Sequence, residues 1–541
     1  MKSIKKIFTF MACALLMLAC DDLNTVPEGG SVTTDQDKAI GEAIPSRVSA
    51  KLSGMYNIIA QQYCVYGSAT GRHDDFGYPA ITLSQDLNGP DMTCVDDGYN
   101  WFTVSSDYTD RSETFANPYM RYGVFYKQIQ MANSIIASID PETDNPTLKA
   151  YLAQAKATLA FDYLSLVPYY QFKYKGHEDE LSVPLIGGDG DPANNPRKTV
   201  REVYKYIMDN INEAIEGLKD YKRTSKAEID QNVAYGIRAR ANLYMENWED
   251  AAADAEKALA GYTPASREEI SKPAFIDIKD HNWMWGLIIG PEKITAAYPS
   301  WPAKLSSFSG DSYTAAVGCY KRINKILFDL IPASDARKGW WVDDKLKTAN
   351  LESVTWDGKS GNDIPPLVID GVKVAFLPYT NVKFGQYGGP GSTVNAGDWC
   401  LMRVEEMILI QAEALAMSGK DGKTVLESFV KTYRDPSYTC PASSGESFQN
   451  EVWKQRRIEL WGEGFAMSDI MRLGKNMVRV VAGKESNIPL NFQFNLAADD
   501  EWLLLRFPQQ ETNSNPAVKQ NSGGTEPKEG DGANLRDGIT N

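Results

Sequence analysis

The sequence predicts a mainly α-helical protein in which a scaffold of repeated helices carries a loop-rich, irregular half that binds a ligand. Three observations predict this fold class. Alanine-rich stretches with apolar residues at helical spacing recur at 151–170, 233–259 and 401–417. Long stretches rich in Gly, Pro, Asp and aromatic residues separate the helices. The chain also opens with lysines and a short apolar run, which belongs to targeting rather than to the fold.

The opening segment has the features of a lipoprotein signal peptide. Three lysines precede an apolar run over residues 7–18, which is shorter than the ~20 residues that a membrane-spanning helix requires. The run ends in Leu-Met-Leu-Ala before Cys20, which is similar to a lipobox with Met17 where Leu is usual. We expect cleavage after Ala19 and acylation of Cys20, with palmitate among the chains that hold the protein on a membrane. The alternative is an ordinary secretory signal in which Cys20 has no such role.

Residues 233–259 form the clearest predicted repeat unit. Ala234, Ile237 and Ala241 lie on one face of a helix, and Asn247-Trp248 interrupts the pattern before a second alanine-rich helix. Two helices joined by a tight turn, with small residues at their contact, resemble a tetratricopeptide repeat (TPR) unit.

The same pattern predicts further helices along the chain. Apolar stripes run through 122–139, 151–170 and 401–417, and Thr199 with Glu202 forms a capping box that begins another helix. Helices of this kind stack into a right-handed solenoid. Scaffolding alone would account for them, because their apolar faces bury one another without a ligand.

Three long loop regions separate the predicted helices: 67–118, 262–315 and 336–400. Loops of this length within a compact protein are uncommon unless they have a function. By contrast, the Gly, Pro and charged residues after position 521 are typical of a flexible, solvated tail.

The composition argues against several classes of function. A formal net charge of −15 disfavours binding to nucleic acid or to anionic lipid through a general field. The five cysteines after Cys20 match neither a zinc site nor a disulfide framework, so we expect them to be small buried residues. The three histidines are not paired at metal-ligand spacing, which argues against a zinc or triad mechanism. We expect no cofactor and no metal, and the acidic loops show no EF-hand spacing for calcium.

Three segments together resemble the SusD/RagB family of nutrient-binding lipoproteins. The first, RRIELWGEGFAMSDIMR at 456–472, is similar to the C-terminal signature of that family, with Ala466 where the family usually has Arg and Ile470 where it has Leu. The segments at 401–416 and 503–521 are similar to its Arg-x-x-Glu helix and its closing segment. The residues of the signature that match are Arg456, Arg457, Glu459, Leu460, Glu463, Gly464, Asp469 and Arg472.

The resemblance implies a SusD-like fold and a role in nutrient uptake. Such a protein captures an oligosaccharide and delivers it to a TonB-dependent (SusC-like) outer-membrane transporter, and it does not break bonds. Asp21-Asp22 resembles the export signal of lipoproteins that face the cell exterior, so we expect a lipid-anchored protein of the outer membrane. Peptide or glycoprotein cargo stays open within the family. The implied divisions are a signal peptide (1–19), an N-terminal SusD-like region with TPR-like helices (20–260), a C-terminal SusD/RagB region (261–521) and a flexible tail (522–541).

Glu459 and Glu463 raise the alternative of a surface-anchored glycan hydrolase. Carboxylates four residues apart share a helix face, as an acid and base pair would require. However, Arg456, Arg457 and Arg472 lie at helical spacing around them, so ion pairing would keep both carboxylates ionised. We therefore interpret this pair as structural. A further alternative is a TPR-type interaction module that binds no glycan and uses its aromatic loops only for packing.

The aromatic loops contain the candidate ligand-binding residues. Sugar rings stack their C–H faces on Trp and Tyr, and their hydroxyl groups require polar partners at the edges. The stretches 72–76 and 96–102 supply both kinds of group, and the resemblance adds tryptophans from the middle of the chain. Packing within the protein is an equal alternative for each single aromatic residue. The candidates are Arg72, Asp74, Tyr99, Asn100, Trp101, Trp301, Trp340 and Trp341.

Overall fold

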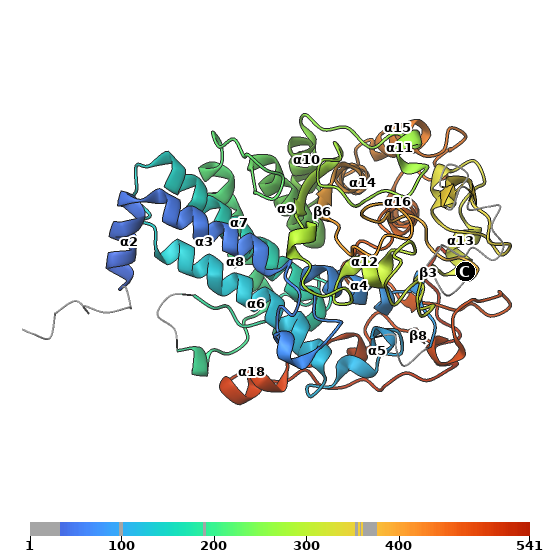
Figure 1. The fold of residues 1–541 in the computed structure, drawn as a ribbon, viewed down its shortest axis with the longest axis horizontal. Coiled ribbons are helices and arrows are strands. Elements are labelled where there is room, and N and C mark those ends of the chain that lie inside the picture. The colour runs from blue at the N-terminus through green and yellow to red at the C-terminus, as the bar shows by residue number, and fades with distance from the viewer. Residues whose placement is uncertain (1–32, 97–100, 188–190, 352–354, 357–358, 361–375) are drawn as a thin grey trace, which may run out of the picture.

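The computed structural model describes residues 33–96, 101–187, 191–351, 355–356, 359–360 and 376–541 (Figure 1). The described residues are mainly helical, which confirms the predicted fold class. The predicted signal peptide, Cys20, Tyr99 and Asn100 lie outside the described residues. Within the described ranges, no helix is both long enough and apolar enough to span a membrane.

Helices that follow one another in the chain pack side by side in the N-terminal part. Contacts run from α2 to α3, from α3 to α6, and onward through α7, α8, α9 and α10, and α10 then packs on α14. This succession is the helical-repeat scaffold that the sequence predicts. The helices are α2 (Thr34–Ala43), α3 (Pro45–Ile58), α4 (Tyr78–Asn88), α5 (Thr103–Ser106), α6 (Ala116–Ala137), α7 (Pro146–Tyr170), α8 (Val200–Gly217), α9 (Gln231–Tyr244) and α10 (Trp248–Leu259).

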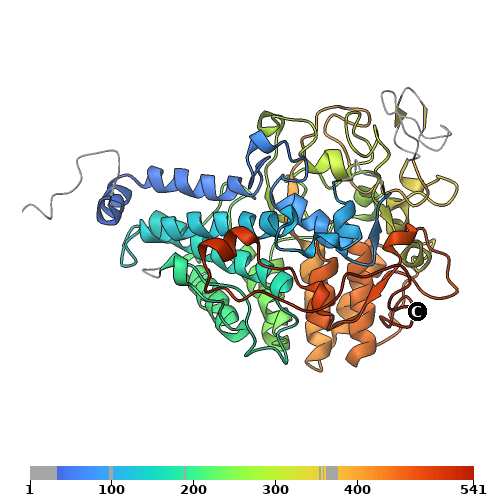
Figure 2. The same ribbon diagram turned by 90° about the horizontal axis from the view of Figure 1, so that it is seen from below.

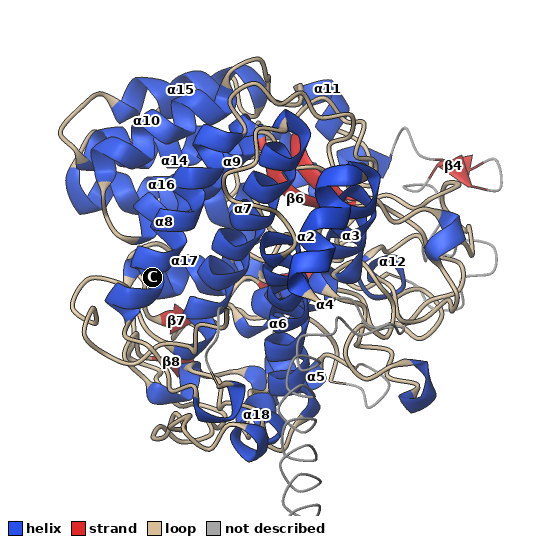
Figure 3. Ribbon diagram, turned by 90° about the vertical axis from the view of Figure 1, so that its left-hand side faces the viewer, coloured by secondary structure: helices blue, strands red, loops and turns tan. Residues whose placement is uncertain are grey.

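The C-terminal part combines further helices with short strands and long loops. Figure 3 shows α8, α9, α10 and α14 to α16 gathered on one side, and α12 with its neighbouring loops and strand β4 on the other. Figure 2 shows the same separation from below. The helices are α11 (Arg267–Ile270), α12 (Trp301–Leu305), α13 (Lys325–Asp329), α14 (Val404–Met417), α15 (Gly422–Tyr433), α16 (Gly445–Glu459), α17 (Ala466–Leu473) and α18 (Gln509–Ser514).

The described strands form antiparallel pairs between distant parts of the chain. The longest pair has an irregular register near Trp285, and its two strands come from either end of the middle loop regions. The pairs are β1 (Met92–Thr93) with β3 (Arg322–Ile323), β2 (Trp283–Leu287) with β6 (Trp399–Arg403), β4 (Thr355–Trp356) with β5 (Lys359–Ser360), and β7 (Met477–Val478) with β8 (Asn495–Leu496). Short 3-10 turns cover Ser68–Thr70, Thr109–Arg111, Pro192–Asn194, Pro291–Lys293, Ala336–Trp340, Ala349–Leu351, Leu490–Phe492 and Glu501–Leu503.

Local sequence explains where several helices begin and how closely they approach. The capping box at the start of α8 is present: the Thr199 side chain accepts from the Glu202 N–H, and the Glu202 carboxylate accepts from the Thr199 N–H. At the other end of α8, a Cβ on Gly217 would lie 2.8 Å from the Cβ of Ala153 in α7. Small residues therefore permit the close contact of α7 and α8.

Two sequence expectations about local structure were wrong in detail. The stretch 401–417 was expected to be one helix, but its first residues belong to β6 and the helix begins at Val404. Helix α4 lies within the expected loop 67–118, and all its residues but Tyr78 are buried. Its polar side chains, Ser84, Gln85 and Asp86 among them, are buried together with its apolar ones, so the helix does not show the exposed polar face of the amphipathic pattern by which a helix is predicted.

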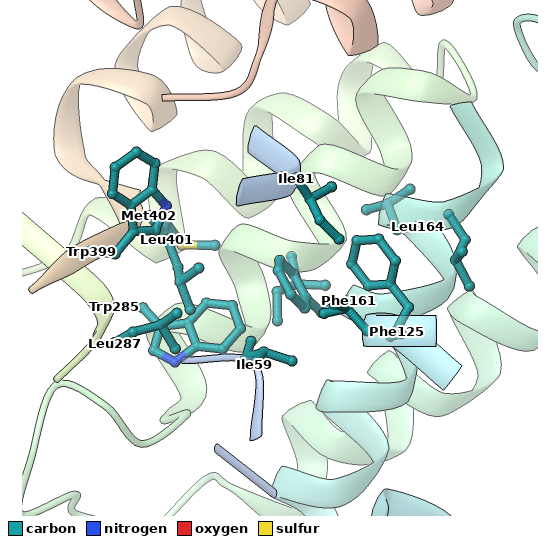
Figure 4. Packing of buried hydrophobic residues seen from close by; sticks show 14 of the residues in the cluster. Ile59, Ile81, Phe125, Phe161, Leu164, Trp285, Leu287, Trp399, Leu401 and Met402 are labelled. Carbon is teal, nitrogen blue, oxygen red and sulfur yellow. The ribbon is translucent and has the colours of Figure 1, made fainter. Parts of the chain in front are cut away.

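The hydrophobic core crosses the expected boundary at residue 260. Phe161 of α7 meets Trp285 of β2 edge to face, with ring centroids 4.8 Å apart, beside Met402 of β6 (Figure 4). In addition, both oxygens of Glu406 accept from the Arg240 guanidinium at 2.6 Å. The regions on either side of residue 260 therefore share one core.

The end of the chain packs more firmly than the predicted flexible tail. Asp537 is buried and accepts a hydrogen bond of 2.8 Å from Arg457. Nearby, Thr540 is also buried. A polar composition predicts solvation, but this ion pair and further hydrogen bonds, such as that of the Asn476 side chain to the Arg536 carbonyl at 2.8 Å, hold the segment against the body.

Candidate functional site

A group of half-buried aromatic side chains lies where three loop segments meet. His73, Trp101, Tyr298 and Tyr313 form this group, which we call the aromatic cluster. The His73 ring centroid lies 5.4 Å from Trp101, 5.4 Å from Tyr298 and 5.8 Å from Tyr313, and Tyr298 lies 5.4 Å from Tyr313. Tyr298 is 38% exposed, and the other three rings are partly accessible. The cluster therefore presents ring surface to solvent, as stacking on a sugar requires.

The Tyr313 hydroxyl joins the rings of the cluster through hydrogen bonds. The Trp101 Nε1–H donates to it at 2.9 Å, and His73 Nδ1 lies 2.7 Å from it. Because an indole N–H only donates, the Tyr313 oxygen accepts from Trp101, and its own proton is left to donate to His73 Nδ1 in the tautomer that has this nitrogen unprotonated. Burial, and then the charge of Lys304, lower the pKa of His73, which favours the neutral ring. The rings are thus held in fixed orientations before any ligand arrives.

Arg72 lies at the edge of the cluster. Its guanidinium carbon lies 5.5 Å from the Tyr66 ring and 5.5 Å from the Trp101 ring, and its Nη2 donates to Asp74 at 2.6 Å. Asp74 is buried, so it positions Arg72 rather than reaching out to a ligand. Among the described residues, neither Arg72 Nε nor Asp74 Oδ1 has a hydrogen-bond partner. Arg72 is therefore the charged donor of the site.

Lys304 of α12 packs against the Tyr313 ring of the cluster. Its side chain is fully buried, with Nζ 3.3 Å from the centroid of the Tyr313 ring. Within the described part of the chain Nζ has no hydrogen-bond partner. Burial, followed by the nearby charge of Lys321, holds the pKa of Lys304 well below its ordinary value. The amine thus packs against the Tyr313 ring and is not accessible to solvent.

Asp75 shapes the loop that carries Arg72 and His73. Its carboxylate accepts from the backbone N–H of Val65, at 3.0 Å and 3.1 Å, and of Tyr66 at 2.8 Å. Gly77 closes the loop with a φ of +72°, at a place where a Cβ would lie 2.2 Å from the carbonyl oxygen of Ile59. Only glycine fits such a position. A buried acid and a glycine thus hold the site loop in one shape.

The structure corrects the sequence prediction for Trp301, Trp340 and Trp341. These side chains are 1%, 0% and 1% exposed, so they belong to the core and not to a binding surface. Trp301 Nε1 donates to the carbonyl of Gly397 at 2.7 Å, and Trp340 Nε1 donates to that of Ile270 at 2.9 Å. Residue type alone cannot separate a tryptophan that fills a loop core from one that faces solvent.

Of the predicted site residues, the structure brings together Arg72, Asp74 and Trp101. Sequence reasoning missed Tyr298 and Tyr313, and it included His73 only as part of a stretch. The two tyrosines flank α12, on either side of the buried Trp301. The one sequence signal for the two tyrosines was their place inside the loop region 262–315. The hydrogen bond between Trp101 and Tyr313 joins residues some 200 positions apart, so local sequence does not predict it.

Glu459 and Glu463 are ion-paired, as interpreted from the sequence, but with other partners. Glu459 accepts from Arg403 and Arg434 at 2.8 Å and from Arg337 at 3.2 Å. Glu463 accepts from Arg403 at 2.8 Å and from the fully buried Lys383 at 2.6 Å. Burial acts to raise the pKa of both carboxyls, but the facing cations outweigh it, so both pKa values are lowered.

The expected partners of this carboxylate pair bind elsewhere. Arg456 pairs with Asp469, Arg472 with Asp469 and Glu413, and Arg457 with Asp91 and Asp537. Helical spacing shows which residues share a face, but it does not show which distant segment covers that face. The ionised and buried pair offers no raised pKa and no open path for acid catalysis.

Comparison with known proteins shows which family model the chain matches and which solved structures have a similar fold. Residues 371–523 match the SusD family model. A SusD-like carbohydrate-binding protein from Bacteroides vulgatus superimposes with a TM-score of 0.70 at 21% identity, over 87% of this chain and 97% of that chain. A surface glycan-binding protein A from Bacteroides fluxus gives a TM-score of 0.61 at 16% identity, over 88% of this chain and 99% of that chain.

A laminarin-binding SusD-like protein is also similar, with a TM-score of 0.59 at 18% identity over 88% of this chain and 99% of that chain. A search of curated protein sequences found no match. The described residues therefore have the SusD-like fold. The match of residues 371–523 to the SusD family model agrees with the resemblance seen in the sequence.

Proposed function

We propose that this protein binds an oligosaccharide at the aromatic cluster. The observation that carries the proposal is the set of half-exposed rings of His73, Trp101, Tyr298 and Tyr313, which hydrogen bonds and Lys304 hold in place beside the Arg72 guanidinium. Rings of this kind stack on the C–H faces of sugars, and Arg72 supplies a donor for hydroxyl oxygens. Similarity to proteins described as carbohydrate-binding, glycan-binding and laminarin-binding supports the same ligand class.

We further propose that the protein is anchored on the outer face of the outer membrane through acylated Cys20. There it passes its ligand to a TonB-dependent transporter. The lipobox-like sequence before Cys20 and the acidic pair after it support the anchor. The SusD family match supports the transporter as partner.

Binding is tested by calorimetry with the chain lacking residues 1–20, against a panel of neutral and acidic oligosaccharides. We expect at least one glycan to bind, and Trp101→Ala to weaken that affinity about tenfold or more, since a central stacked ring contributes on the order of 1.5 kcal/mol or more. The matched control is Trp248→Ala, which removes a partly exposed tryptophan at the start of α10 on the helical side. Equal losses for both variants, or no binding by the wild-type protein, would contradict the proposal.

The same samples distinguish the other functions considered. Shortened products after incubation with a bound glycan would identify a hydrolase. A protein that binds no glycan but captures a peptide through its helices would be an interaction module.

The anchor is tested with Cys20→Ala. The variant is expected to fold and bind glycan as the wild type does, but to lose surface retention and ligand uptake by cells. Ser substitution at Cys13 in the apolar run is the control, because it leaves the lipobox-like Cys intact. Uptake that survives Cys20→Ala would overturn the proposed delivery to a transporter.

A further inference from the structure

Exposed apolar side chains lie both at the aromatic cluster and on the loop at 386–395, and hydrogen bonds join the two loops. Of the eight exposed large apolar side chains among the described residues, Tyr298, Val394 and Tyr387 lie on two loops that are bonded to each other, with exposures of 38%, 39% and 46%. We call these three side chains the apolar strip. Exposed apolar groups that gather in this way mark binding surfaces more often than singly scattered ones do.

Asn395 joins the two loops. Its side-chain amide donates to the carbonyls of Ala297 at 2.9 Å and Asp311 at 2.7 Å, and its oxygen accepts from Ser309 at 2.6 Å. The backbones also meet, because Gly391 N–H donates to Phe308 at 2.8 Å. The loop that carries Tyr298 and the loop that carries Val394 are therefore one rigid unit.

Gln386 extends this unit to Tyr387. Its buried amide donates to the carbonyls of Val394 at 3.0 Å and Ser392 at 3.3 Å. Gly388, Gly389 and Gly391 follow with φ values of +78°, +90° and +83°, which makes the tight turn that leaves the Tyr387 ring in solvent. Gln386 Oε1 is buried and has no hydrogen-bond partner within the described ranges. The buried Gln386 side chain thus holds the turn, and the next residue, Tyr387, is 46% exposed.

Tyr298 connects the strip to the cluster. Its ring lies 5.4 Å from that of His73, and its hydroxyl donates to Asp311 at 2.9 Å. The carbonyl of the same Asp311 accepts from Asn395. A continuous bonded path thus leads from the aromatic cluster to the backbone of Tyr387. The rings of the cluster and the turn that carries Tyr387 are held before binding, which lowers the entropy cost of ligand capture.

We infer that Tyr387 is a second stacking platform for the same ligand, so that the preferred ligand is an extended oligosaccharide that spans both platforms rather than a mono- or disaccharide. This inference rests on the proposed function. One end of the chain stacks on Trp101 and Tyr298, and units further along reach Val394 and Tyr387.

The experiment titrates oligosaccharides of one linkage and increasing length into the chain lacking residues 1–20. The linkage is chosen as the tightest binder of the panel. Wild-type affinity is expected to rise with length and then level off. Tyr387→Ala should weaken the binding of the longest member about two- to tenfold and leave the shortest unchanged. Tyr387→Phe, which keeps the ring, should retain the wild-type affinity.

Phe115→Ala is the matched control, since Phe115 is a 41% exposed aromatic side chain next to α6 and outside both loops. Three outcomes overturn the inference: affinity that does not change with length, a Tyr387→Ala variant that binds the longest member normally, or an equal loss for short and long members. Absence of any binding by the wild-type protein is a different result, because it contradicts the proposed function itself.

Discussion

The ion-pair network around Glu459 and the aromatic cluster around Trp101 both place charged groups against aromatic rings, but they differ in how fully their polar atoms are paired. Both oxygens of Glu459 accept hydrogen bonds from arginines, and the side chain is inaccessible to solvent. At the cluster, the rings are half exposed, and Arg72 and Lys304 each keep a nitrogen without a hydrogen-bond partner among the described residues. Complete pairing with full burial indicates a structural role, whereas half-exposed rings beside the partly exposed Arg72 guanidinium leave surface that a ligand can contact.

The largest expected effect is on stability, from Glu459→Ala. This change leaves Arg337, Arg403 and Arg434 buried together without their shared carboxylate. Breaking a buried pair in this way lowers the free energy of unfolding by about 3–5 kcal/mol, which urea denaturation measures. Lys205→Ala, which removes an exposed pair with Asp209, should change stability little. If Glu459→Ala unfolds at the wild-type urea concentration, the network is not what holds this region.

Trp341→Phe separates packing from binding. Trp341 is buried and meets Trp461 edge to face at 5.4 Å, so the smaller ring should cost about 1–3 kcal/mol of stability and leave glycan affinity per folded molecule unchanged. Thermal unfolding and calorimetry on the same sample measure both quantities. A loss of affinity without a loss of stability would return Trp341 to the binding site.

Tyr313→Phe tests the hydroxyl that joins the cluster. The variant keeps the ring on Lys304 but removes the hydrogen bonds to Trp101 and His73, each worth about 1 kcal/mol. Because these rings then lose their fixed orientation, we expect a severalfold loss of glycan affinity with a small change in melting temperature. Unchanged affinity would show that the rings do not need this anchor.

The smallest expected effect is a pH dependence of binding through His73. Its pKa lies below the ordinary value of 6.5, so the ring is neutral at pH 7 and the Nδ1 acceptor is present. The contribution of the neutral ring is complete above pH 6.5 and is lost as the pH falls through the lowered pKa. Glycan affinity should therefore be constant from pH 8 to 7 and decline in more acidic buffer.

His73→Phe is the control for this pH dependence, since phenylalanine keeps a ring but does not titrate. The variant should lose the decline at acidic pH. A decline that persists in His73→Phe would assign the titration to another group.

Much of the fold could be predicted because its signals are local. The capping box of Thr199 and Glu202, the break at Asn247 and the alanine face of α9 each lie within a few residues of one another. The site was less predictable. Arg72, Asp74 and Trp101 come from short stretches rich in aromatic and polar residues, but Tyr298 and Tyr313 join them only through a return of the chain from more than 200 positions away.

The sequence by itself determined the helical scaffold, the family resemblance, the lipobox-like Cys20 and the prediction that the aromatic loops bind a ligand. Only the tertiary structure decided which aromatic residues face solvent, and it placed Trp301, Trp340 and Trp341 inside and Tyr298 outside. It also decided that Glu459 pairs with Arg337, Arg403 and Arg434 rather than with the arginines beside it in the chain. The reason is physical: helix propensity and capping act between neighbours in sequence, whereas burial and ion pairing depend on which distant segments cover a side chain.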